Sequence, residues 1–109
     1  MTAAELTFMV TYVAEMISSP TFFDQLTNEG VSPDELKGTR QEANALVAAL
    51  RATPADKIDA IAEQYNDELR ALRGNFQGEW VMNRLQGFHD AQVMFGFVNS
   101  IFNKAHIRA

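Results

Sequence analysis

Four acidic side chains recur at steps of three or four residues, at Asp56, Asp59, Glu63 and Asp67. Residues at this spacing share one face of a helix, so the four carboxylates form a stripe opposite the apolar face of the same segment. Carboxylates can bind a divalent cation, but on one straight helix they splay apart, and we expect no metal here. The plainest interpretation is a solvated face. The functional interpretation is a docking surface for a basic partner.

The remaining reactive side chains form no catalytic constellation that the sequence reveals. His89 and Asp90 are neighbours, so on a helix they point about 100° apart and cannot act as a dyad. No histidine has the spacing of a helical zinc or di-iron site, and no serine stands in a nucleophile elbow. The chain has no cysteine, which excludes a thiol nucleophile and a cysteine-held metal. We therefore expect no enzyme activity and no cofactor.

The charge balance limits the classes of partner. Fourteen acidic residues against nine basic ones give a net charge of −5, which disfavours binding to a phosphate backbone. The one basic cluster, Arg70, Arg73 and Arg84, is too small for a nucleic-acid-binding stripe. The longest unbroken apolar run, residues 45–50, is far shorter than the roughly 20 residues that span a bilayer. We expect a cytoplasmic protein that binds neither nucleic acid nor membrane directly.

The elements that must position these residues are all predicted to be helices. Thr2 and Glu5 have the spacing of a capping box, and three prolines follow Ser or Thr, as at the start of a helix. Gly30 is placed as a left-handed helix end, and Gly38 is a possible break. No stretch alternates as a strand does. The pattern predicts an all-α fold, a compact bundle of four to five helices in one domain over residues 1–109. The expected helices cover residues 3–17, 20–29, 33–52, 53–74 and 79–104.

The long C-terminal helix changes character halfway along. The face that is polar in its first half continues as Val93, Met94, Phe97 and Ile101, and no charged residue occurs between Asp90 and Lys104. A helix that is apolar nearly all round must be covered nearly all round. Three covers are open: the first helix of the same chain, a second copy in a homodimer, or a ligand or another protein. For oligomeric state we predict the homodimer.

These observations together predict a non-catalytic function. We expect a small acidic helical protein that binds another macromolecule, most simply a protein, as an adaptor, regulator or inhibitor. Its contact surfaces would be the apolar C-terminal face and the acidic stripe. The analogy is to small acidic inhibitors and immunity-type proteins, including phage-encoded ones. The alternative is a helical carrier or sensor that encloses an apolar small molecule inside the bundle.

Overall fold

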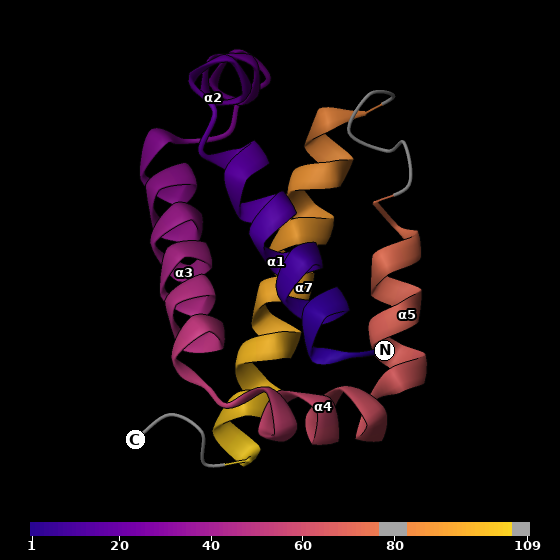
Figure 1. Ribbon diagram of the computed structural model, residues 1–109. Coiled ribbons are helices and arrows are strands. Elements are labelled where there is room, and N and C mark those ends of the chain that lie inside the picture. Colours follow the sequence, from indigo (N-terminus) through magenta and orange to yellow (C-terminus); the bar gives the residue numbers. More distant parts are fainter. Residues whose placement is uncertain (77–82, 106–109) are drawn as a thin grey trace.

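The computed structural model describes residues 1–76 and 83–105, and within them the chain is helical, with no strand (Figure 1). This confirms the all-α prediction. The described helices number six, where four to five were expected. They are α1 (Ala3–Ile17), α2 (Pro20–Asn28), α3 (Pro33–Ala52), α4 (Ala55–Gln64), α5 (Asn66–Gly74) and α7 (Arg84–Lys104). None of these helices is both long enough and apolar enough to cross a membrane.

The helix ends follow the local signals in the sequence. Thr2 and Glu5 form the capping box: the Glu5 N–H donates to Thr2 Oγ1 at 3.2 Å, and the Thr2 N–H donates to Glu5 Oε1 at 3.4 Å. The Ser32 hydroxyl oxygen likewise accepts from the third helical N–H of α3 at 3.1 Å. Gly30 has a φ of +97°, a left-handed conformation that a side chain would strain. α3 continues through Gly38, so the possible break there does not occur.

The single helix expected over residues 53–74 is wrong, because the chain turns at Tyr65 and makes two helices. Tyr65 has φ −111° and ψ 28°, outside the helical region. α4 lies across the foot of the bundle, and α5 runs up along its side (Figure 1). Both helices contribute to the core, with Ile61 buried on α4 and Leu69 buried on α5. The Tyr65 ring then packs edge-on against Phe97, with centroids 6.1 Å apart.

In the view of Figure 1, α1 crosses in front of α7, between α3 and α5. α1 packs on α2, α3, α4 and α7, which makes it the most widely connected helix of the described part. Met94 and Ile101 are 0% and 2% exposed, so the apolar half of α7 is covered largely by the chain's own helices. Of the three covers left open by the sequence, helices of the same chain account for these two residues. The predicted start of the last helix, residues 79–82, lies outside the described residues.

Candidate binding surface

The outer face of α1 carries two exposed aromatic side chains. Leu6, Val10 and Val13 face the core, while Phe8 is 71% and Tyr12 47% exposed. The two aromatic residues are four positions apart and therefore adjacent on one helix face. Their rings are stacked, with centroids 6.1 Å apart and planes inclined by 16°. Together they form an apolar ridge, which we call the Phe8–Tyr12 ridge.

A surface hollow lies on each side of this ridge, and Phe8 borders both. The first, of about 270 Å³, lies toward α5 and is lined mainly by apolar side chains. The second, of about 550 Å³, lies toward the end of α3 and the start of α4. Its walls include the small side chain of Ala4 and the apolar side chains of Leu50 and Ile58. A partner could thus seat apolar groups on both flanks of Phe8.

An ion pair closes the first hollow at one end. Arg73 Nη1 of α5 lies 2.9 Å from Glu5 Oε2 of α1. Partial desolvation on its own raises the pKa of Glu5. Hydrogen bonds from Thr2, the positive charge of the Met1 amino group and a hydrogen bond from Arg73 outweigh this effect, so the pKa is lowered below its usual value. Glu5 therefore remains ionised into acid conditions. Arg73, which the sequence placed in a basic cluster, is engaged within the chain.

The acidic stripe is divided by the turn at Tyr65. Asp56, Asp59 and Glu63 lie exposed on α4, whereas Asp67 lies exposed on α5. The structure thus keeps three of the four carboxylates on one helix. Among them, Asp59 also has a structural role, because its Oδ1 accepts the N–H of Ala3, 56 residues away, at 2.5 Å.

This hydrogen bond ties the start of α1 to the foot of the bundle. Met1 N donates nearby to Asn66 Oδ1, at the junction of α4 and α5. A shallow hollow of about 490 Å³ lies there, bordered by Asp59 and Glu63. Ala3 borders the second hollow of the ridge as well. The acidic part of α4 is therefore adjacent to the N-terminal end of the Phe8–Tyr12 ridge.

On α7 only part of the predicted interface reaches the surface. Val93 is 61% exposed, Phe97 is half-buried against Tyr65, and Met94 and Ile101 fill the core. The predicted homodimer through this helix remains a prediction for solution measurements. Two of the four residues on which it was based, however, are covered within one chain.

The other reactive side chains flagged in the sequence have hydrogen-bond partners on their own helices. His89 Nδ1 lies 3.3 Å from Gln92 Oε1, and Asp90 Oδ1 accepts from Gln86 at 3.1 Å. Arg70 donates to Asn66 Oδ1 at 3.1 Å. Among the described residues, no three His, Asp or Glu side chains are close enough together to hold a metal ion.

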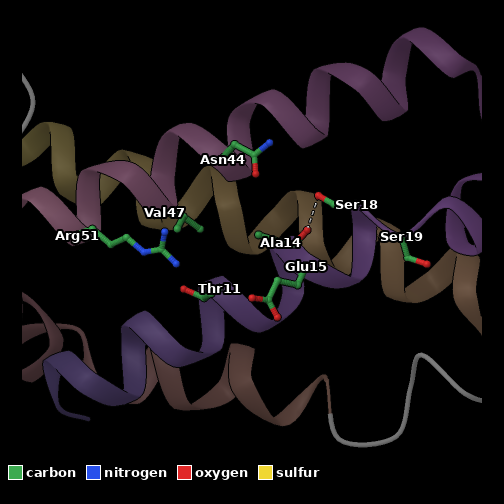
Figure 2. Close-up of a pocket in the computed structure, with 8 residues that line it drawn as sticks. All are labelled: Thr11, Ala14, Glu15, Ser18, Ser19, Asn44, Val47 and Arg51. Carbon is green, nitrogen blue, oxygen red and sulfur yellow. Dashed lines mark hydrogen bonds between the residues drawn. The ribbon is translucent and has the colours of Figure 1, made fainter.

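A fourth concave region lies between α1 and α3 and has a different character (Figure 2). This α1–α3 groove, of about 310 Å³, is lined by Thr11, Ala14, Glu15, Ser18, Ser19, Asn44, Val47 and Arg51. Three of these residues carry charged or amide groups, and the other five carry hydroxyl or small apolar groups. No motif in the sequence indicated it, because its residues come from two helices.

The hydroxyl of Thr11 is the unusual group in this groove. Thr27, Thr39 and Thr53 each donate a hydrogen bond to the carbonyl four residues earlier, at 3.1, 3.0 and 2.6 Å. Thr11 Oγ1 is also buried, but it has no hydrogen-bond partner. A buried hydroxyl without a partner costs about 1–3 kcal/mol. Thr11 therefore keeps its hydrogen-bonding capacity unused at the groove.

Comparison of the chain with models of known protein families, with curated proteins and with solved structures found no match. Its function is therefore argued from its own surfaces.

Proposed function

We propose that this protein is a non-catalytic binding module that holds a second protein on the outer face of α1, as an adaptor, regulator or inhibitor. The observation that carries the proposal is the Phe8–Tyr12 ridge, with Phe8 71% exposed between two hollows. Large aromatic side chains are enriched among residues that dominate binding energy at interfaces. A ridge of this kind on a packed helix supports a contact surface. The cytoplasmic location expected from the sequence belongs to the same proposal.

The partner's chemistry follows from what surrounds the ridge. The hollows suit apolar side chains, and α4 carries the exposed carboxylates of Asp56 and Glu63, of which Glu63 borders the hollow beside Met1 and Thr2. A complementary segment therefore carries one or two apolar anchors followed by basic residues. A second copy of the chain fits less well, because it carries the same net charge of −5 and the same acidic helix.

The alternative of a carrier for an apolar small molecule has less support. It requires the apolar face of α7 to line an internal cavity. Met94 and Ile101 on that face instead form part of the packed core.

The test compares two exposed apolar positions on different helices. A photo-crosslinking phenylalanine analogue is placed at Phe8 in one variant and at Val93, the matched control, in another. Each is expressed in the native host. We expect one protein to be crosslinked from position 8 and not from position 93. That protein is then purified and its affinity measured by calorimetry.

The affinity measurements use side chains whose removal leaves the core intact. Phe8→Ala is expected to weaken binding about 30-fold, as loss of a central aromatic residue commonly does. Val93→Ala should change the dissociation constant by less than about twofold. Neutralising Asp56 and Glu63 should slow association and flatten its salt dependence. Equal crosslinking from both positions, or full affinity after Phe8→Ala, would refute the proposal.

A further inference from the structure

The α1–α3 groove combines opposite charges that are not paired with each other. Arg51 extends from α3 toward α1, and Glu15 extends along α1 on the side of Thr11 (Figure 2). Among the described residues, neither makes an ion pair, since the one ion pair found there joins Glu5 and Arg73. Both side chains are exposed and can adjust to a ligand. The groove therefore offers a cation and an anion on one small surface.

Neutral polar groups complete the lining. The Asn44 side chain reaches over the groove from α3 and has no hydrogen-bond partner in the described part of the chain (Figure 2). The buried Thr11 hydroxyl is unpartnered too, while the Ser18 hydroxyl is occupied by the Ala14 carbonyl at 2.8 Å. Ala14 and Val47 supply an apolar floor. Donors and acceptors thus surround a small apolar patch.

From this arrangement we infer that the α1–α3 groove binds a small zwitterion of the free α-amino acid class. Arg51 pairs with its carboxylate, as guanidinium groups do with two parallel hydrogen bonds. Glu15 accepts from its ammonium group, and the exposed Asn44 amide offers a further hydrogen bond. The side chain of the ligand rests on Ala14 and Val47. A volume of about 310 Å³ is at the lower end for ligand sites, which fits a molecule of this size.

This site adjoins the proposed protein-binding surface and overlaps it in part. Thr11 and Arg51 line both the groove and the second hollow of the Phe8–Tyr12 ridge. The readout below uses the isolated protein and needs no partner. The two proposals can therefore fail separately.

The experiment is an NMR titration of the ¹⁵N-labelled full chain with L-leucine. Two analogues are titrated in parallel: 4-methylpentanoate, which lacks the ammonium group, and 3-methylbutylamine, which lacks the carboxylate. We expect saturable shifts of amides near Thr11, Glu15, Asn44 and Arg51 with leucine. Both analogues should bind about tenfold more weakly or worse, because each lacks one charged contact.

Variants assign the contacts, and both charged residues are exposed, so the fold should hold. Arg51→Gln removes the partner of the carboxylate, so this variant should bind leucine no better than 3-methylbutylamine. Glu15→Gln removes the partner of the ammonium group, so this variant should bind leucine no better than 4-methylpentanoate. Arg70→Gln, which removes an arginine far from the groove, is the matched control and should leave binding unchanged. The inference is overturned if L-leucine at about 10 mM gives no localised shifts, since binding weaker than this is roughly too weak for a specific site. It is also overturned if Arg51→Gln binds leucine as wild type does.

Discussion

Met94 and Val93 are consecutive residues on α7, yet they have opposite surroundings. Met94 is fully buried, and Val93 is 61% exposed. Truncation of each to Ala therefore tests which face of α7 the chain itself covers. Met94→Ala removes a buried side chain and leaves a cavity, which costs about 2–5 kcal/mol in the free energy of unfolding. Val93→Ala removes an exposed side chain and should change it by less than about 0.5 kcal/mol.

The measurement is urea denaturation followed by far-ultraviolet circular dichroism, at two protein concentrations. We expect a lower midpoint for Met94→Ala with an unchanged slope, and no dependence on concentration. A homodimer through this face predicts the contrary: stability that rises with concentration, since association stabilises the folded chain. A loss below about 1 kcal/mol for Met94→Ala, or a concentration-dependent midpoint, would refute the packing described above.

Three further predictions concern polar contacts of α1. Thr11→Val removes the unpartnered buried hydroxyl at nearly constant shape, so thermal unfolding should show a gain of about 1 kcal/mol; a loss would mean that the hydroxyl has a partner in solution. Asp59→Ala removes the acceptor of the Ala3 N–H and should cost about 0.5–2 kcal/mol in urea denaturation, as loss of a helix cap does. Because the pKa of Glu5 is lowered on folding, its stabilising effect is present above its usual value of 4.5 and is lost as pH falls through the lower, folded-state value. The difference in stability between wild type and Glu5→Gln should therefore shrink in acid, and a difference that stays constant down to pH 3 would contradict the lowered pKa.

Local signals were sufficient for most helix boundaries. The capping box at Thr2, the proline starts of α2 and α3 and the glycine at the end of α2 each depend on a few neighbouring residues. Short-range hydrogen bonds and backbone preferences decide such features, and a sequence displays them directly. The turn at Tyr65 has no such signal. Burial against other helices imposes it, so the pattern alone predicted one continuous helix.

The surface on α1 was not indicated by the sequence, for a related reason. The absence of charge between Asp90 and Lys104 suggested an uncovered face on α7, but α1 shows the same absence between Glu5 and Glu15. Periodicity cannot show how much of each helix is covered, since that depends on contacts between distant segments. Among the described residues, the exposed large apolar side chains are Phe8 and Tyr12 on α1 and Val93 on α7.

The many contacts of α1 also have a consequence during synthesis of the chain. α1 is synthesised first, yet α7, which it covers, ends at Lys104. At 5–20 residues per second, roughly 5–20 s separate the two helices during translation. Until α3 and α4, on which α1 also packs, have been made, Leu6, Val10 and Val13 have no core to enter. The side of α1 that contacts α7 stays available to chaperones or to other nascent chains for longer. Completion of α7 covers that side and leaves the Phe8–Tyr12 ridge exposed.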